Sequence, residues 1–361
     1  MTDVLPTPQR GLSLGPDVLV GIQDSLSAAE SAGGVVVRRY ALAGTTVRLR
    51  FAGDAVLDSL AQAFAHLEVQ EDDSEPALTV AFWDSASTGA EPPPRPAVPS
   101  EYAPGALFHF DEPPLRAAYQ PGLSTLSVYK ADVGQAWHWV EDASAQPYWD
   151  KASPIRQILF WWLAGRGYLQ VHGAAVGRAE GGVLLVGRGG SGKSTTALST
   201  LGTDMLYAGD DYVAVTTHPE PRVQSLYNTG KLDPHHLNSL LPELLPLLSN
   251  AERLEVEKAV MYVQDHYPEQ TTRGFPLRAV LVPKVCVGPR ESRIVEATRA
   301  SAFAALAPST IFQLHTAGSE ALSIMSQLVA RVPCYGLELG SDISAIPQTI
   351  GSFLDELGKD R

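Results

Sequence analysis

The stretch from Gly187 to Ser194 reads GRGGSGKS, and it constrains the fold of this chain more than any other feature. It matches G-x-x-x-x-G-K-[ST] at every fixed position, and a chance match somewhere in such a chain is on the order of 1%. The pattern requires a strand before it and a helix after it. Residues 182–186 (GVLLV) form a short apolar run, and residues 195–201 are typical of a helix. The sequence therefore predicts an α/β unit that carries this loop.

The residue types in the loop suit a phosphate group. Glycines let the backbone approach an anion without Cβ clashes, and successive amide groups point at it. Lys193 is expected to reach the β- and γ-phosphates, and the Ser194 hydroxyl to ligate Mg²⁺. We therefore expect ATP and Mg²⁺ to bind here. The residues expected to surround the nucleotide phosphates are Gly187, Arg188, Gly189, Gly190, Ser191, Gly192, Lys193, Ser194 and Thr195.

Two adjacent carboxylates follow the loop at short spacing. Asp210 and Asp211 come after a strand-like segment, Met205 to Ala208, which leaves room for one helix and one strand after Lys193. The pair is thus expected at the same sheet edge as the phosphates. Successive strand residues point to opposite sides, so one carboxylate can hold Mg²⁺ while the other accepts a proton from an attacking hydroxyl. A solvated Gly-Asp-Asp turn is the alternative interpretation.

A histidine and several cations complete the set of candidates. His172 lies in the segment Tyr168 to Val176, which is expected to be one strand preceding the loop strand. A single histidine near a sheet is more often structural than functional. Lys231, in a predicted Gly-Lys turn, is a candidate for contact with substrate or phosphate. Lys258, Arg273 and Arg278 are weaker candidates of the same kind, because an isolated cation is usually a solvated surface residue.

The segments VHGAAV, GVLLVGRGGSGKST and LYAGDDYVAV, taken together, resemble the HPr kinase/phosphorylase family of bacterial serine kinases. The resemblance covers roughly residues 168 to 215. It implies a catalytic domain similar to that of phosphoenolpyruvate carboxykinase. It also implies catalytic roles for Lys193, Asp210, Asp211 and His172. Ser194 and Asp211 are the expected Mg²⁺ ligands, and which aspartate acts as the base is left open.

The segment after the aspartate pair, VTTHPEPRVQSLYNTGKLDP, departs from the family's glycine-rich pattern for HPr recognition. The chain looks closer to the HPr-kinase-like proteins of peptide biosynthetic clusters, including those linked to lasso peptides. That resemblance implies transfer of a phosphoryl group to a Ser or Thr hydroxyl of a peptide or small protein. A small-molecule kinase on the same fold and a non-catalytic ATP-binding regulatory module remain alternatives.

The rest of the chain predicts a second domain. We place a boundary near residue 150, with a smaller α+β domain over residues 1–150 for substrate or partner recognition. Residues 151–361 form the α/β (α+β) catalytic domain. The first 35 or so residues carry Pro and Gly with little periodicity and are expected to be loosely ordered. Residues 55–67 have helical spacing, with Asp54 as the expected N-cap.

The composition of the chain excludes several classes of binding partner. The net charge of −13 argues against a general binder of nucleic acid or of anionic membranes. Two cysteines make neither a disulfide framework nor a CxxC zinc site. The N-terminal residues lack a signal-peptide pattern, and no apolar run is long enough to span a membrane. These features predict a cytoplasmic location, and they leave homo-oligomer formation open.

Overall fold

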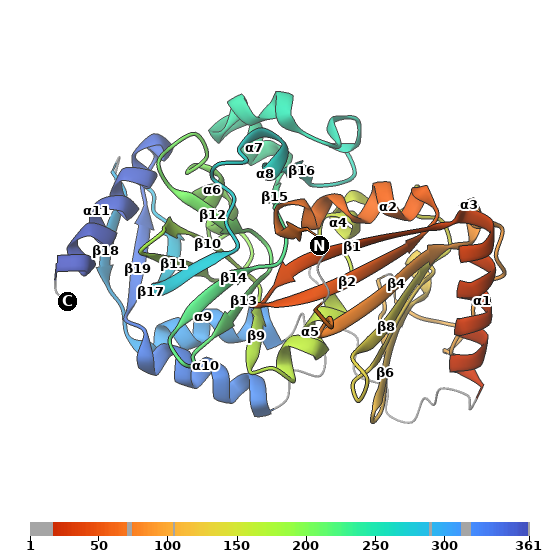
Figure 1. The fold of residues 1–361 in the computed structure, drawn as a ribbon. Coiled ribbons are helices and arrows are strands. Elements are labelled where there is room, and N and C mark those ends of the chain that lie inside the picture. Colours follow the sequence, from red (N-terminus) through yellow and green to blue (C-terminus); the bar gives the residue numbers. More distant parts are fainter. Residues whose placement is uncertain (1–16, 71–73, 104, 289–290, 312–318, 360–361) are drawn as a thin grey trace. The chain divides into compact units, whose positions relative to one another are not determined.

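The computed structural model describes residues 17–70, 74–103, 105–288, 291–311 and 319–359. They belong to two compact units. Unit 1 comprises Met1–Gln62 and Leu67–Trp162, and unit 2 comprises Ala63–His66 and Leu163–Arg361. The protein is a mixed α+β structure with several mixed sheets (Figure 1). Among the described residues, no helix is both long enough and apolar enough to cross a membrane.

In the described part of unit 1, eight strands form one sheet in the order β3-β1-β2-β4-β8-β7-β6-β5. The strand β4 pairs in parallel with both β2 and β8, and the remaining pairs are antiparallel. The strands are β1 Val35–Leu42, β2 Thr45–Ala52, β3 Glu68–Val69, β4 Leu78–Asp84, β5 Phe108–Glu112, β6 Leu115–Gln120, β7 Thr125–Lys130 and β8 Gln135–Val140. The helices are α1 Val18–Gly33, α2 Asp54–Leu60, α3 Ser85–Thr88, η2 Pro121–Leu123, α4 Tyr148–Lys151 and α5 Arg156–Ala164. The last two residues of α5 belong to unit 2, as do residues 63–66 of η1 Gln62–Leu67.

The helix α1 corrects the expectation of loose order for Val18–Gly33; the part of that expectation that concerns residues 1–16 lies outside the described residues. Its buried side chains include Val18, Ile22, Leu26 and Ala29, spaced by three and four residues, so they form one apolar stripe. The stripe belongs to the same core cluster as the sheet residue Trp83. The helix α2 also differs from expectation in detail, because the residue at its N-cap is Gly53 and Asp54 is already its first residue.

In the described part of unit 2, nine strands form a larger sheet, whose main path is β12-β10-β11-β17-β14-β13-β9. The strands β18 and β19 extend it beside β17. The strands are β9 Tyr168–Val171, β10 Gly173–Arg178, β11 Gly181–Val186, β12 Leu206–Gly209, β13 Val213–Thr216, β14 Arg222–Ser225, β17 Gly274–Val285, β18 Arg293–Glu296 and β19 Cys334–Leu339.

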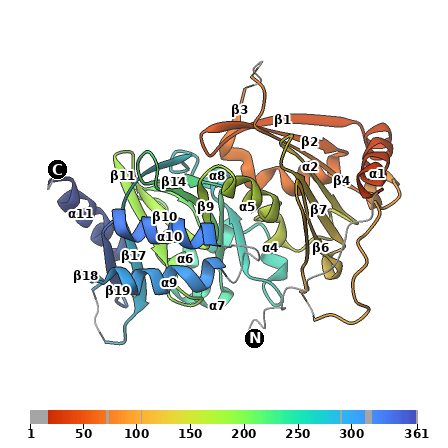
Figure 2. The same cartoon turned by 90° about the horizontal axis from the view of Figure 1, so that it is seen from below.

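Helices line both faces of this sheet. A cluster on one face joins Leu198 of α6 to Ile350 of α11, and a cluster on the other joins Leu306 of α9 to Leu328 of α10. Figure 2 shows α9 and α10 side by side across the sheet. The helices are α6 Lys193–Leu198, α7 Pro234–Leu240, η3 Pro242–Leu247, η4 Ala251–Arg253, α8 Val263–His266, α9 Arg299–Ile311, α10 Ser319–Arg331, η5 Ile343–Ala345 and α11 Ile346–Lys359.

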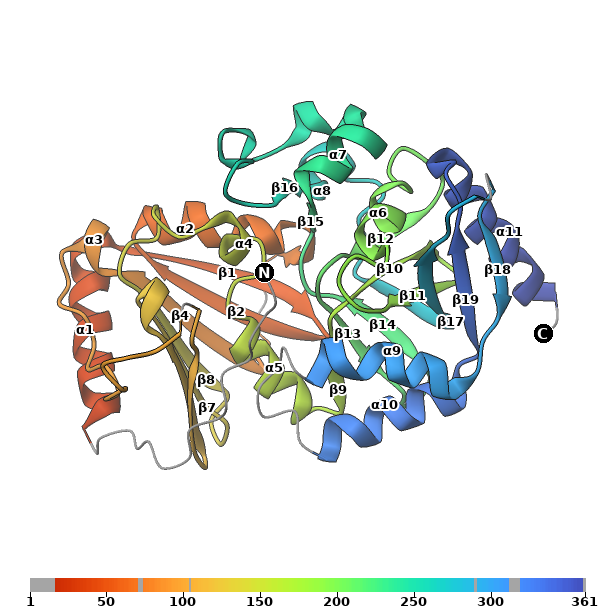
Figure 3. The ribbon, with the colours of Figure 1, turned by 180° about the vertical axis from the view of Figure 1, so that it is seen from behind.

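A separate two-stranded sheet packs against α6. It consists of β15 Thr229–Leu232 and β16 Ala259–Tyr262, and α7, η3 and η4 lie between them in the chain. A Cβ added to Gly230 would lie 2.5 Å from Cδ2 of Leu198 in α6, so the glycine permits this close packing. Figure 3 shows β15 passing beside α6.

The expected single strand from Tyr168 to Val176 is in fact two strands. In β9, Val171 pairs with Val213, whereas Gly173 in β10 pairs with Val186 in β11. His172 is therefore the residue at which the chain changes from one set of strand partners to another. Side chains at such a break are released from the regular alternation of a strand, and this one faces the site described next.

Candidate functional site

Sheet topology brings the predicted residues to one edge. The strand β10 runs antiparallel to both β11 and β12, so β11 and β12 run in the same direction. Gly173 pairs with Val186 at the end of β11, and Ala175 pairs with Gly209 at the end of β12. The loop after β11, the aspartates after β12 and His172 before β10 therefore meet at this edge.

The loop owes its shape to glycine. Gly187, Gly190 and Gly192 have φ angles of 153°, 77° and 101°, a region that glycine adopts more readily than other residues. A Cβ on Gly187 would lie 2.8 Å from Ser191 Oγ, which is too close for ordinary packing. At Gly189, by contrast, no described heavy atom would lie within 4 Å of an added Cβ. The loop is thus tightly wound at its ends and open at its centre.

Lys193 is held within the curve of this loop. It is the first residue of α6, and its side chain is buried. Its Nζ donates to the carbonyl oxygens of Gly187 at 2.7 Å and Arg188 at 3.3 Å. Burial lowers the pKa of Lys193, and the charges of Asp210 and Asp211 oppose that shift. Arg188 itself is exposed, and Thr195 is buried inside α6.

Asp210 is the deeper of the two aspartates, with only 1% of its surface exposed. Its Oδ1 accepts a hydrogen bond from Ser194 Oγ at 3.0 Å, and its Oδ2 accepts one from the Lys231 amide at 3.2 Å. Burial, followed by the neighbouring charge of Asp211, raises the pKa of Asp210 to about 6. Ser194 is thus adjacent to Asp210, whereas the sequence-based expectation groups Ser194 with Asp211 as Mg²⁺ ligands.

Asp211 points in a different direction because its backbone is left-handed, with φ at 72°. Its Oδ2 lies 2.7 Å from Lys231 Nζ, and its Oδ1 lies 3.5 Å from His172 Nε2. Burial alone would raise the pKa of Asp211. The Lys231 ammonium, followed by His172, outweighs burial and holds that pKa below its usual range. Asp211 is therefore a carboxylate that stays ionised at neutral pH.

Two neighbours of Asp211 differ from the sequence-based description. Lys231 lies in strand β15 and is only 7% exposed, so the prediction of a Gly-Lys turn is wrong. The Tyr212 ring lies 5.4 Å from the His172 ring, measured between centroids. Sequence reasoning did not single out Tyr212. Its position directly after the aspartate pair was the one available signal.

The weaker cationic candidates separate into near and distant ones. Lys258 is exposed just before β16, and its charge influences both Lys193 and Asp211. Arg273 lies within electrostatic range of the half-buried His66. Arg278 is wrong as a site candidate, because its guanidinium donates to the Glu180 carbonyl just before β11 begins, at the opposite end of that strand from the loop Gly187–Ser194.

The donors and acceptors at this edge fit a nucleotide phosphate with Mg²⁺. Ser191 Oγ is buried and has no hydrogen-bond partner among the described residues, so the loop retains a donor for an incoming oxygen. Ser194 Oγ and Asp210 Oδ1 form an oxygen pair of the kind that Mg²⁺ prefers. In the described part of the chain, no three His, Cys, Asp or Glu side chains gather as a metal cage. Mg²⁺ held by one or two carboxylates and substrate phosphates does not require one.

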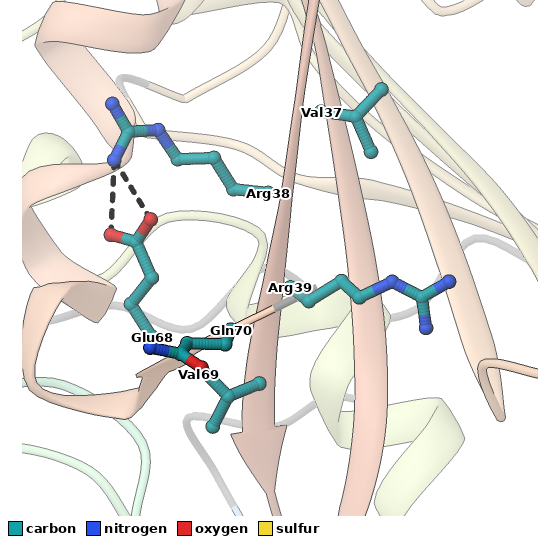
Figure 4. A pocket seen from close by; sticks show the side chains of 6 residues that line it. All are labelled: Val37, Arg38, Arg39, Glu68, Val69 and Gln70. Atoms are coloured by element: carbon teal, nitrogen blue, oxygen red, sulfur yellow. Dashed lines mark hydrogen bonds and ion pairs between the residues drawn. The ribbon is translucent and has the colours of Figure 1, made fainter. Parts of the chain in front are cut away.

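A different hollow lies in unit 1 at the edge of the sheet (Figure 4). It is lined by β1 and β3, and the Arg38 guanidinium donates to both oxygens of Glu68, at 2.9 and 3.0 Å. Arg39 donates to the carbonyl oxygen of Ser74. Both arginines are engaged by protein oxygens, and none of the predicted site residues lines this hollow. Its residues are Val37, Arg38, Arg39, Glu68, Val69 and Gln70.

No protein-family model matches the chain, and a search of curated proteins finds no match. The geometry at the sheet edge therefore carries the functional argument.

Proposed function

We propose that this protein is an ATP- and Mg²⁺-dependent kinase that transfers a phosphoryl group to a hydroxyl group. The observation that carries the proposal is the convergence of two sets of side chains on one sheet edge. Lys193 and Ser194 come from the loop after β11, and Asp210 and Asp211 follow β12. Nucleotide binding alone would not need the second carboxylate, whose surroundings differ from those of the first.

The two aspartates suit separate tasks. Asp210 is buried and touches Ser194, so this pair would hold Mg²⁺ against the phosphates. Asp211 is more accessible, with 23% of its side chain exposed, and it is kept ionised. Asp211 would therefore receive the acceptor's proton as the acceptor oxygen bonds to phosphorus and the bond to the leaving ADP breaks. Lys193 would offset the negative charge on the phosphates.

His172 and Lys231 would act on Asp211 rather than on phosphorus. Both approach its carboxylate oxygens, and Lys231 also fixes Asp210 through its backbone amide. They hold the carboxylate in one orientation, which matters because misplacement of a base by about 1 Å can reduce the rate by about 10²-fold. We assign them positioning roles.

For the acceptor, we propose a Ser or Thr hydroxyl of a peptide or small protein. The support is the resemblance of the three sequence segments around His172, the loop and the aspartate pair to HPr-kinase-like proteins of peptide biosynthetic clusters. A small-molecule hydroxyl is the second candidate acceptor, since the same chemistry serves both. A regulatory module that binds ATP without turnover is the third alternative.

The test uses the intact chain with Mg²⁺, ATP and two acceptor sets. One set holds Ser- and Thr-containing peptides, and the other holds small hydroxyl metabolites. Mass spectrometry should detect a phosphorylated product in one set. The product should fall at least about 10²-fold with Asp211→Asn, which removes the base, and with Lys193→Ala.

Matched controls come from exposed residues of the same unit. Lys359→Ala in α11 and Asp204→Asn beside β12 should leave turnover unchanged, because these side chains lie outside the site. Unchanged product formation by both Lys193→Ala and Asp211→Asn would refute the site assignment. ATP binding without transfer to either set, and without ADP formation, would favour the regulatory alternative.

A further inference from the structure

The phosphate loop has two flanks along the sheet edge, and they differ in chemistry. On one flank, β10 and β12 bring His172, Asp210 and Asp211. On the other flank, β17 pairs in parallel with β11, and β19 pairs in parallel with β17. The γ-phosphate and the nucleoside are at opposite ends of the triphosphate chain. If Mg²⁺ and the γ-phosphate lie beside the aspartates, the nucleoside therefore lies on the other side of the loop.

The side chains of the second flank touch the loop itself. Val285 ends β17 and pairs with Leu339, which ends β19. A Cβ on Gly192 would lie 2.3 Å from Leu339 Cδ1 and 3.7 Å from Val285 Cγ2. The loop backbone therefore rests directly against this apolar pair, with no space left for another side chain between them.

The same flank continues as an exposed apolar surface. Leu339 is buried, but Val285 is 62% exposed and Val287 is 102% exposed. Scattered surface valines need no explanation. These two differ because Val285 lies next to Gly192 of the loop, 3.7 Å from the position of an added Cβ, so a ligand bound at the loop would lie beside them. Ligand sites are lined mainly by apolar side chains beside a few placed polar groups, and this flank adjoins the polar part of the site.

We infer that Val285 and Val287 form the nucleobase subsite, against which the flat face of the base of the bound nucleoside triphosphate packs. The inference rests on the proposed function and goes further by assigning residues that discriminate a nucleotide from a bare polyphosphate. The base would be held by apolar contact with two aliphatic side chains on the flank away from Asp210 and Asp211.

The test compares two ligands of equal phosphate charge on the intact chain. One is ATP, and the other is ribose 5-triphosphate, which is ATP without its base. Equilibrium dissociation constants are measured with Mg²⁺ by calorimetry for the wild type and for Val285→Asp and Val287→Asp. Val133→Asp is the matched control, because Val133 is a similarly exposed valine that belongs to unit 1.

We expect the wild type to bind ATP at least about tenfold more tightly than ribose 5-triphosphate, because the second ligand lacks the ring that would make the apolar contact. Each subsite variant should weaken ATP binding by a larger factor than ribose 5-triphosphate binding, because the new carboxylate repels the phosphates of both ligands but only ATP also loses its base contact. The control variant should leave both affinities unchanged. Equal affinity of the wild type for both ligands, or an ATP preference unaltered in both variants, would overturn this inference alone. Failure of both ligands to bind would overturn it together with the proposed function.

Discussion

Replacement of Lys231 by methionine tests the geometry around the aspartate pair most sharply. Methionine keeps most of the length and apolar volume of the side chain but removes the ammonium group. In the structure, that group lies 2.7 Å from Asp211 Oδ2, while the backbone amide of residue 231 holds Asp210 and is unaffected. The substitution therefore removes one ion pair and leaves the strand hydrogen bonds in place.

The expected loss of stability follows from burial. Breaking a fully buried pair by removing one partner costs about 3–5 kcal/mol, whereas exposed pairs contribute about 0–1 kcal/mol. The Lys231 and Asp211 side chains are 7% and 23% exposed, so this pair lies nearer the buried limit. His172 still approaches the other oxygen of Asp211. We expect unit 2 to lose about 2 kcal/mol of unfolding free energy.

The assay must report on unit 2. The six tryptophans of the chain all belong to unit 1, so their emission follows that unit: Trp83, Trp137, Trp139, Trp149, Trp161 and Trp162. Hydrogen exchange of peptides that cover β12 and β15, measured across a urea series, follows unit 2.

The control for this prediction is Lys130→Met in unit 1, whose stability is followed by tryptophan emission across the same urea series. It breaks the more exposed Lys130–Asp132 pair and should cost less than about 0.5 kcal/mol. A loss below about 0.5 kcal/mol for Lys231→Met would refute the buried ion pair.

Three further outcomes are expected. Asn228→Ala should destabilise unit 2 by about 2 kcal/mol in the same exchange assay, because the buried Asn228 side chain and amide both donate to the Ala63 carbonyl; protection of β15 equal to wild type would contradict this. Burial lowers the pKa of His138 to about 4, against an ordinary value of 6.5. The unfolded chain therefore binds the proton more readily than the folded chain. The contribution of neutral His138 to the free energy of unfolding is complete above about pH 6.5 and falls by roughly 3 kcal/mol as the pH drops toward 4. Tryptophan emission of wild type and His138→Gln should diverge over that range, and parallel pH profiles would refute the assignment. Gly192→Ala should destabilise the loop by about 1–3 kcal/mol because residue 192 has a positive φ. Gly189→Ala should leave thermal unfolding unchanged and weaken ATP binding. Equal melting temperatures for the wild type and Gly192→Ala would contradict the prediction for Gly192.

The strand, loop and helix around Gly187–Ser194 were predictable because each carries a local signal. An apolar run ends at Val186, and glycines stand where the backbone needs positive φ. The helix was expected over residues 195–201 and is found at Lys193–Leu198. The placement of Asp210 beside the loop was also predictable, since its spacing allows only one short helix and one short strand. These inferences depend on residues near one another in sequence.

Features that depend on distant partners were not predictable. The break at His172 arises because Val171 pairs with β13 while Gly173 pairs with β11, and nothing in the intervening sequence specifies that exchange. The choice of Asp210 as the partner of Ser194 depends on the left-handed backbone at Asp211. Lys231 was found as a candidate, but its strand and its burial depend on pairing with β16.

The helix α1 was missed for a different reason. The spacing of Val18, Ile22 and Leu26 was present in the sequence, but it directly follows a stretch rich in Pro and Gly. The apolar stripe indicates a helix clearly only when the sheet of unit 1, against which it packs, is known. Periodicity over such a short segment is a weaker signal than a fixed motif.

The measurement that tests the central claim most directly is the binding of ATP to the intact chain with and without Mg²⁺, by calorimetry. The account predicts that Mg²⁺ strengthens binding, that Lys193→Ala abolishes it, and that Asp210→Asn removes the dependence on Mg²⁺ while leaving weaker binding. No detectable binding by the wild type, or binding by Lys193→Ala equal to that of the wild type, would contradict the claim that this sheet edge is a nucleotide phosphate site.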